Sequence, residues 1–264
     1  MMTEPSWMAD LLDFDRDGDV FLAPQLGVPG MRLFGGLIAA QALGAAGATV
    51  DPGKHPQSLH AYFVRGGEFG VDVELEVERT RDGRSFDTRR VTARQKGKVI
   101  LEMIASFQIP EDGADWHPAR PPSVPLEAAV PKKPDLDFAD WLELRCDPAD
   151  TTRFVLPPFW IRSRGTIEDD PLIRACTLTF VSDIGPVPAA RPPGTPFTPG
   201  AGTGFATSLD HSVWFHRPFD PDQWHCYEID SLGNSHSRGL VVGGLYDAAG
   251  VLVANTSQQA LWRL

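Results

Sequence analysis

The sequence predicts an α+β fold that is built twice, because strand and turn signals recur in the same order along its 264 residues. "SLHAYFVRGG", which begins at Ser58, is echoed by "SLDHSVWFHRPF", which begins at Ser208. The Gly-centred turn in "TRDGRSF" is echoed by "SLGNSHSR", and "RQKGKVI" is echoed by "DAAGVLV". The last strands end in "IASFQ" and "NTSQQ", which places Gln108 and Gln258 at the same spacing as the two serines. Four matches in one register indicate a duplicated unit.

One helix precedes the long strands of each copy. The segment 34–48, "FGGLIAAQALGAAGA", is rich in small residues that allow close packing. The segment 169–183, "DDPLIRACTLTFVSD", offers Asp170 as N-cap and Pro171 at the first helical position. Helical spacing then places Asp183 at the C-terminal end, on or near the packed face. Desolvation and the helix dipole both disfavour a carboxylate there, so we expect it to have a compensating partner or a function.

The strands complete the fold class. "VDVELEVERTRDG" at 71–83 alternates apolar and charged residues with a period of two, which is typical of a half-buried strand. A central helix wrapped by a long antiparallel sheet, occurring twice, describes a tandem, or double, hotdog fold, and we expect the two sheets to be joined.

The domain boundaries follow from the prolines. There are seven prolines from Pro110 to Pro134 inclusive, and proline locks φ and cannot donate to a strand ladder. We therefore predict an N-terminal hotdog repeat at 1–112, a Pro-rich linker at 113–150 and a C-terminal hotdog repeat at 151–264. A second Pro/Gly-rich loop is expected at roughly 185–204.

Composition excludes several classes of function. The formal net charge of -11 disfavours nonspecific binding to nucleic acid or to an anionic membrane, so an anionic substrate would need a local cluster of arginines. No apolar run approaches the roughly 18 residues that a membrane span needs, and no secretory signal opens the chain. Cys146, Cys176 and Cys226 are odd in number and far apart, which favours reduced, buried thiols over disulfides or a zinc site. We expect a cytoplasmic protein without membrane insertion.

Residues 208–219 hold two serines, an aspartate and two histidines, and three interpretations apply to them. Strand alternation places Ser208 and Asp210 on one face and His211 on the other, and neither face has a metal-ligand pattern. A Ser/His/Asp hydrolase would need a G-x-S-x-G elbow, and the nearest match, "GNSHS" at 233–237, ends in serine. Structural hydrogen bonding is therefore the interpretation we favour for Asp210 and His211.

Several motifs taken together resemble the type II acyl-CoA thioesterase family over most of the chain. They are "RLFGGLIAAQAL", "SLHAYFVRGG", "RTRDGRSFDTRRV", "LDHSVWFHRPF" and "SRGLVVGGLYDAAGVLVANTSQQ". The resemblance implies a double hotdog that hydrolyses acyl-CoA to fatty acid and coenzyme A. We expect no metal and no cofactor. It also implies that Asp183, Ser208 and Gln258 hold the attacking water. The family commonly has threonine at the position of Ser208.

The resemblance and the repeat together set further expectations about the site. Copy one has Ala45 and Ala46 where its helix ends, so we expect one working site per chain, in copy two. Gly36 and His60 are the copy-one candidates for substrate binding, the glycine through backbone N–H groups at a helix start. Candidates for the phosphates of coenzyme A are Arg162, Arg164, Arg174, Arg217 and Arg238.

Two alternatives stay open, and one assembly is expected. A catalytically silent acyl-CoA or lipid binder of the same fold would need only one altered water ligand. A hotdog enoyl-CoA hydratase would need a histidine about five residues after its aspartate, where this chain has Pro188. The expected assembly is a homo-oligomer, a dimer of double hotdogs.

Overall fold

The computed structural model describes residues 6–25, 33–118, 120–133, 138–152, 154–195 and 205–263, so part of the expected loop at 185–204 lies outside the described residues. The chain forms two compact units. The first unit comprises the chain up to Trp116 together with Gly165–Val181 and Pro218–Pro221. The second unit comprises His117–Arg164, Ser182–Arg217 and Asp222–Leu264.

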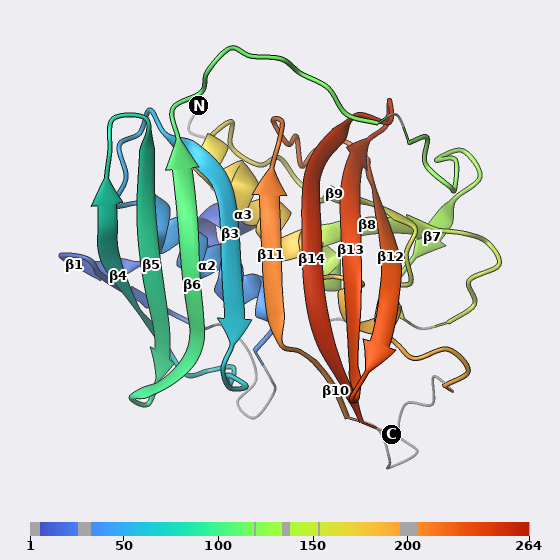
Figure 1. Cartoon of the computed structure of the whole chain (residues 1–264), viewed down its shortest axis with the longest axis horizontal. Coiled ribbons are helices and arrows are strands. Elements are labelled where there is room, and N and C mark those ends of the chain that lie inside the picture. The colour runs from blue at the N-terminus through green and yellow to red at the C-terminus, as the bar shows by residue number, and fades with distance from the viewer. Residues whose placement is uncertain are drawn as a thin grey trace. The chain divides into compact units, whose positions relative to one another are not determined.

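The first unit is an antiparallel sheet with strand order β1-β2-β4-β5-β6-β3. Figure 1 shows α2 lying behind strands β4 to β3. Its elements are α1 (Trp7–Leu11), β1 (Asp15–Asp17), β2 (Val20–Ala23), α2 (Gly35–Gly47), β3 (His55–Phe63), β4 (Val73–Asp82), β5 (Phe86–Gln95), β6 (Lys98–Gln108) and α3 (Pro171–Ser182), whose last residue belongs to the second unit.

The second unit repeats this plan with strand order β11-β14-β13-β12-β9-β8-β7, and β10 also pairs with β14. Its elements are β7 (Val130–Lys132), η1 (Ala139–Trp141), β8 (Leu142–Cys146), β9 (Phe159–Ser163), α4 (Pro186–Ala189), β10 (Phe205–Ser208), β11 (Asp210–Phe215), β12 (His225–Ser235), β13 (Arg238–Asp247) and β14 (Leu252–Arg263).

The recurring strand order confirms the predicted duplication. The run β4-β5-β6-β3 in the first unit reappears as β12-β13-β14-β11 in the second (Figure 1). That the two sheets are joined stays a prediction. The range 113–150, which was expected to be a linker, contains two short strands, β7 (Val130–Lys132) and β8 (Leu142–Cys146). These two strands pair with each other.

Small residues of α2 allow helix-to-helix contact inside the first unit. Nearly all of α2 is buried. A Cβ atom at Gly36 would lie 2.5 Å from the backbone oxygen of Phe180, and one at Gly47 would lie 2.4 Å from the Leu172 side chain. Because Phe180 and Leu172 lie at opposite ends of α3, the two helices run antiparallel and touch through these glycines. The small residues therefore serve contact with α3 as well as with the strands.

The predicted start of α3 is confirmed. Asp170 Oδ1 accepts hydrogen bonds from the backbone N–H of Leu172 at 2.8 Å and of Ile173 at 2.9 Å, and Pro171 is the first helical residue. This N-cap fixes where the helix begins, and the helix then runs to Ser182. Asp183 is consequently the first residue after the helix.

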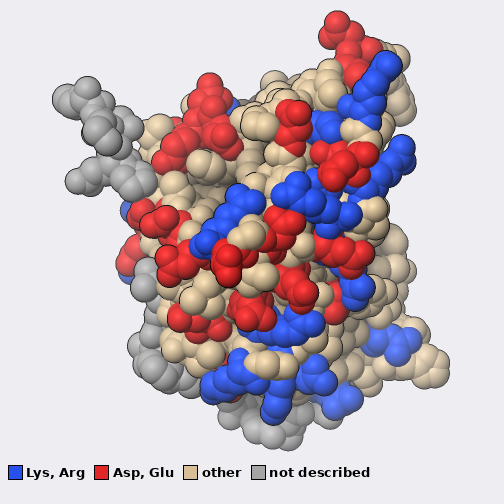
Figure 2. All heavy atoms as spheres, turned by 90° about the vertical axis from the view of Figure 1, so that its left-hand side faces the viewer, with Lys and Arg blue, Asp and Glu red and all other residues tan. Residues whose placement is uncertain are grey.

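The outer surface of the first unit carries charges of both signs. In β4, Val73, Leu75 and Val77 are buried and the glutamates between them are exposed, which confirms the predicted alternation. These acidic side chains and their neighbours pair with arginines and lysines across strands, and Figure 2 shows the two signs interleaved on this side. Exposed pairs of this kind contribute little stability each.

A buried arginine ties the end of α2 to the β4–β5 hairpin. Arg89 is 1% exposed, and its guanidinium donates to Thr49 Oγ1 and Thr49 O, to Arg81 O, to Thr88 O and to Asp82 Oδ1 at 2.5–3.0 Å. All five of its N–H groups therefore have an acceptor.

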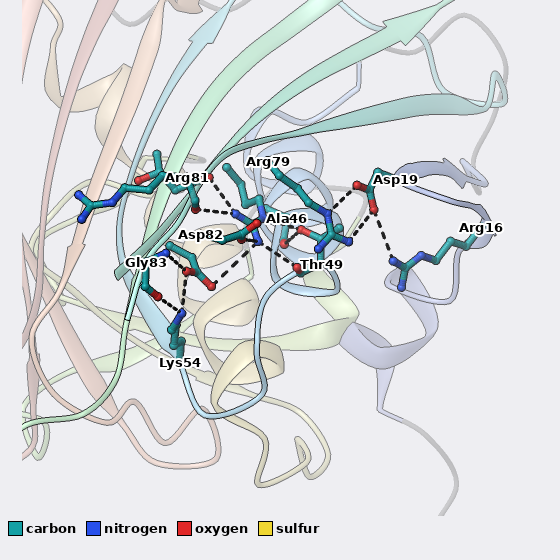
Figure 3. Close-up of polar contacts among 12 residues, drawn as sticks. Arg16, Asp19, Ala46, Thr49, Lys54, Arg79, Arg81, Asp82 and Gly83 are labelled. Carbon is teal, nitrogen blue, oxygen red and sulfur yellow. Dashed lines mark hydrogen bonds and ion pairs between the residues drawn. The ribbon is translucent and has the colours of Figure 1, made fainter. Parts of the chain in front are cut away.

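Two further groups close this cluster. Asp87 accepts from Lys54 Nζ at 2.6 Å and from the backbone N–H of Gly83 at 3.0 Å, and Figure 3 shows Lys54, Gly83, Thr49 and Asp82 converging. The pKa of the Asp87 carboxyl is lowered although burial alone would raise it, because hydrogen bonds from Lys54 and Gly83 outweigh that burial. The end of α2 is thus closed by a fully paired ionic cluster.

Candidate active site

The three residues predicted to hold a water converge within the second unit. Asp183 follows α3, Ser208 ends β10 and Gln258 lies in β14. Gln258 Nε2 donates to Ser208 Oγ at 2.7 Å, and Ser208 Oγ donates to Asp183 Oδ1 at 3.4 Å. Asp183 and Gln258 are 7% and 1% exposed, whereas Ser208 is half-buried. We call these three residues the candidate triad.

A break between two strands turns Ser208 inward. Strand alternation had predicted that Ser208 and His211 lie on opposite faces, and this is wrong because β10 ends at Ser208 and β11 begins at Asp210. At the break, Leu209 N–H donates to Gln259 O, and Asp210 Oδ1 accepts from Gln259 N–H at 2.6 Å. The irregular residue shifts the alternation by one position, as in a β-bulge. The hydrogen-bonding role predicted for Asp210 is confirmed.

His211 is fully buried beside the candidate triad. Its Nε2 lies 2.8 Å from Ser182 Oγ, and Ser182 directly precedes Asp183. Burial lowers the pKa of His211 to about 4, and an interaction with the Gln258 side chain opposes that lowering only in part. The imidazole is therefore neutral near pH 7. Sequence reasoning gave His211 a structural role, and it missed the proximity to Gln258 because that depends on the strand break.

The duplicated positions differ from those that the sequence matched. The turn glycines Gly97 and Gly250, both with positive φ, are corresponding points of the two hairpins. Counted from them, Gln258 corresponds to Ala105 and not to Gln108. The match of Gln108 to Gln258 is wrong because the turn glycines lie 153 residues apart along the chain (250 − 97), whereas the two glutamines lie 150 apart (258 − 108).

Copy one therefore has apolar residues at two positions of the site. Ala105 lies opposite Leu59 in β3, whereas in copy two Ser257 lies opposite Ser212, so the next pair along is Gln258 and His211. Leucine and alanine thus stand in copy one where copy two has histidine and glutamine. Neither side chain can bind a water through a polar atom.

The other predicted site residues lie elsewhere. Gly36 is buried against Phe180 in the first unit, and His60 is exposed on β3 of the same unit. Their contact with substrate stays a prediction. Two of the five candidate arginines form ion pairs, Arg174 with Asp169 and Arg162 with Glu143. Two donate to backbone oxygens, Arg217 to Leu252 O and Arg164 to Leu142 O. Arg238 is exposed.

Arg164 also lines a recess of about 360 Å³ in the second unit. Lys133 and Arg145 contribute further positive charge, and Trp224 contributes an aromatic wall. The Arg145 guanidinium lies 5.2 Å from the centre of the Trp224 ring. Acidic and neutral side chains complete the lining, which is formed by Pro131, Lys132, Lys133, Asp140, Leu142, Glu143, Leu144, Arg145, Arg164 and Trp224.

Family models match both halves of the chain. The acyl-CoA thioesterase N-terminal domain matches residues 23–108, and the acyl-CoA thioesterase C-terminal domain matches residues 110–262. The chain belongs to the acyl-CoA thioesterase family. Human acyl-coenzyme A thioesterase 8 is 36% identical, over 94% of this chain and 86% of the human protein. Acyl-CoA thioesterase 2 of Haemophilus influenzae is 31% identical, over 96% of each chain.

Solved structures agree with this family. The crystal structure of an acyl-CoA thioesterase II, TesB2, from Mycobacterium marinum has a TM-score of 0.81 and 34% identity, and covers 97% of this chain and 96% of its own. A tesB protein from Mycobacterium avium has a TM-score of 0.80 and 31% identity, with 97% of each chain covered. The tandem hotdog predicted from the sequence is thus the fold of this acyl-CoA thioesterase family member.

Other chemistry finds little support in the described part of this thioesterase chain. Burial raises the pKa of Cys146, Cys176 and Cys226, and all three are free and buried as predicted. "GNSHS" forms the exposed tip of the β12–β13 hairpin, with His236 and Ser237 at positive φ, and not a strand-to-helix elbow. Within the described ranges, no His, Cys, Asp and Glu side chains group as a metal site would require, and no helix there is long and apolar enough to cross a membrane.

Proposed function

We propose that this chain hydrolyses acyl-CoA thioesters to fatty acid and coenzyme A, with a water held by Asp183, Ser208 and Gln258. The observation that carries the proposal is the hydrogen-bonded line from Gln258 through Ser208 to the carboxylate of Asp183. A carboxylate after a helix C-terminus, nearly excluded from solvent, is unfavourable unless it serves chemistry or is neutralised. The line occurs in a member of a family of acyl-CoA thioesterases.

The chemistry needs a base and an oriented water but no covalent intermediate. A thiol with a pKa near that of cysteine, about 8.5, leaves readily as thiolate. Asp183 takes a proton from the water as the water oxygen attacks the thioester carbonyl carbon. Ser208 holds the carboxylate, and the Gln258 amide donates to Ser208. The second N–H of that amide is then left to donate to the water oxygen.

Hydrolysis assays over a series of acyl-CoA chain lengths test the activity. We expect release of free thiol, and the chain length with the highest kcat/KM would identify the substrate class. Binding of acyl-CoA by the wild-type protein without thiol release would instead support the silent binder.

Replacing the base tests the assignment of Asp183. Asp183→Asn keeps the shape of the side chain but cannot accept a proton, so we expect kcat to fall by about 10²–10⁴ with KM little changed. Ser208→Thr keeps the hydroxyl and should be nearly neutral, which makes it the matched control. Normal turnover by Asp183→Asn would remove Asp183 from the mechanism and leave hydrolysis itself standing.

We also propose that the recess lined by Arg164, Arg145 and Lys133 receives the phosphates of coenzyme A. The protein is acidic overall, so a polyanionic substrate needs a local positive field. No ion pair found among the described residues engages Arg145, Arg164 or Lys133. Trp224 adds a surface on which an adenine ring can stack.

A substrate truncated before the nucleotide separates this recess from the reaction centre. Arg164→Ala should raise KM for acyl-CoA by several fold and leave KM for the corresponding acyl-pantetheine unchanged, because the latter lacks the nucleotide phosphates. Equal effects on both substrates would contradict the assignment. Arg174→Ala, in the first unit and paired with Asp169, is the control.

We further propose that the chain works in the cytoplasm as a dimer of double hotdogs. The free, buried thiols fit a reducing compartment. Tyr62, Val64 and Ile104 are exposed on β3, just beyond it and on the neighbouring β6, which supports a covering partner on this face. Light scattering after gel filtration should give a dimer mass for the wild type and a smaller mass for Tyr62→Lys.

A further inference from the structure

A line of buried hydrogen bonds runs behind the candidate triad. Tyr227 Oη donates to Ser182 O at 2.9 Å and lies 2.7 Å from Thr256 Oγ1, so the backbone before Asp183 is held from β12. On its other side Ser182 Oγ lies 2.8 Å from His211 Nε2. Ser182 therefore connects the residue that precedes the proposed base to the buried imidazole.

The imidazole faces the amide of Gln258 with its other nitrogen. Strand register places His211 opposite Gln258, one pair beyond Ser212 and Ser257. Both His211 Nδ1 and Gln258 Oε1 are buried, and neither atom forms a hydrogen bond of acceptable distance and angle with the described residues. Because buried polar atoms rarely stay unpaired, the two atoms can satisfy each other after a small adjustment.

Only one direction of donation satisfies every group in the line. Gln258 uses Nε2 to donate to Ser208, so Oε1 is the amide atom that faces His211. The imidazole must then carry its proton on Nδ1 and accept from Ser182 Oγ at Nε2. Each hydroxyl and amide in the line then donates once toward Asp183.

The first copy supports this pairing by contrast. The corresponding pair there is Leu59 and Ala105, both buried and apolar. At these two matched positions, histidine and glutamine occur together in the copy that carries the candidate triad, and neither occurs in the other copy. A histidine that served packing alone would not need a glutamine across the strand.

We propose that His211 is a positioning residue that acts through Gln258, fixing the amide so that its N–H groups face Ser208 and the attacking water. This proposal rests on the proposed function, since it names how that site is oriented. His211 itself contacts neither water nor substrate. Without it the amide of Gln258 can rotate by half a turn and present oxygen to Ser208, which removes the donor from the water.

The test compares four variants of the whole chain with acyl-CoA as substrate. His211→Leu places the copy-one residue at this position, fills a similar volume and removes both ring nitrogens. His211→Asn keeps an N–H close to the position of Nδ1, whereas His211→Gln keeps only a nitrogen close to Nε2. His216→Leu is the control, because His216 directly follows the same strand, is exposed and bonds Asn255. Each His211 variant is also measured in a Gln258→Ala background.

We expect His211→Leu to lower kcat by roughly 10- to 100-fold with KM within about twofold, and His211→Asn to recover more activity than His211→Gln. In the Gln258→Ala background, His211→Leu should lower kcat little further, because the amide that His211 positions is already absent. Unchanged kcat in His211→Leu, or losses that simply add to that of Gln258→Ala, would overturn the proposal. If His211→Leu does not fold, the kcat values of the other two variants test the proposal, and a His211→Asn variant no more active than His211→Gln would overturn it. An inactive wild type would instead overturn the proposed function.

Discussion

At the scale of single residues, burial decides what a side chain can do. His211 lies in a stretch with a second histidine, but only His211 is fully buried, and burial lowers its pKa to about 4. His216 is exposed and bonds Asn255. Two histidines five positions apart thus have different roles because one faces the core and the other faces solvent.

The buried histidine should make stability depend on pH. The ordinary pKa of histidine is about 6.5, so as pH falls from about 6.5 to 4 the unfolded chain takes up a proton that the folded chain resists. The free energy of unfolding therefore decreases as pH falls through this range. Urea unfolding of wild type and His211→Leu at several pH values should show wild type losing about 3 kcal/mol more between pH 7.5 and pH 4, at about 1.36 kcal/mol per pKa unit. Parallel curves would mean that His211 titrates normally in the fold.

At the scale of elements, the ends of the two long helices differ. α2 ends at the Arg89 cluster, where Thr49 and the β4–β5 hairpin supply every acceptor. At the position of Arg89 the second unit has Val241, which packs with Ala190 and Ala260. The position that is ionic in the first unit is therefore apolar in the second, where Val241 lies opposite Gln258 of the candidate triad.

Removing the buried guanidinium should destabilise the first unit. Arg89→Leu leaves several buried carbonyl oxygens without a donor, so we expect a loss of about 3 kcal/mol or more in the free energy of unfolding. Arg90→Leu on the same strand removes only exposed pairs with Glu78 and Glu102 and should cost less than about 1 kcal/mol. Urea unfolding monitored by circular dichroism measures both. Similar losses in the two variants would contradict a structural role for the cluster.

At the scale of the whole molecule, duplication has left unequal halves. Both units keep the same strand order, but the polar residues of the candidate triad belong to the second unit. In the first unit, Ala105 stands at the position of Gln258 and Leu59 stands at the position of His211. The first unit supplies a helix that contacts α3 through Gly36 and Gly47, and α3 ends one residue before Asp183.

The two strand-end glutamines distinguish the halves experimentally. Gln258→Ala should lower kcat by about 10- to 100-fold, because it removes the donor to Ser208. Gln108→Ala should leave kcat within about twofold, because Gln108 is not the counterpart of Gln258. Steady-state kinetics on both variants decide this. A comparable loss in Gln108→Ala would mean that the first copy takes part in the reaction.

The sequence by itself determined the duplication, the two helices and the three members of the candidate triad. These depend on local signals, namely the Asp170–Pro171 helix start, the alternation in β4 and the recurring turn glycines, together with a family resemblance. Local signals persist in the fold because capping and strand burial act over a few residues.

Only the tertiary structure decided which residues face one another. The break at Leu209 turned Ser208 to the side of His211, and strand pairing made Ala105 the counterpart of Gln258. Side chains along a strand point alternately to the two faces of the sheet, so one unpaired residue reverses every face assignment beyond it. The five acceptors of Arg89 come from separate segments, and their convergence depends on how α2 packs against the hairpin.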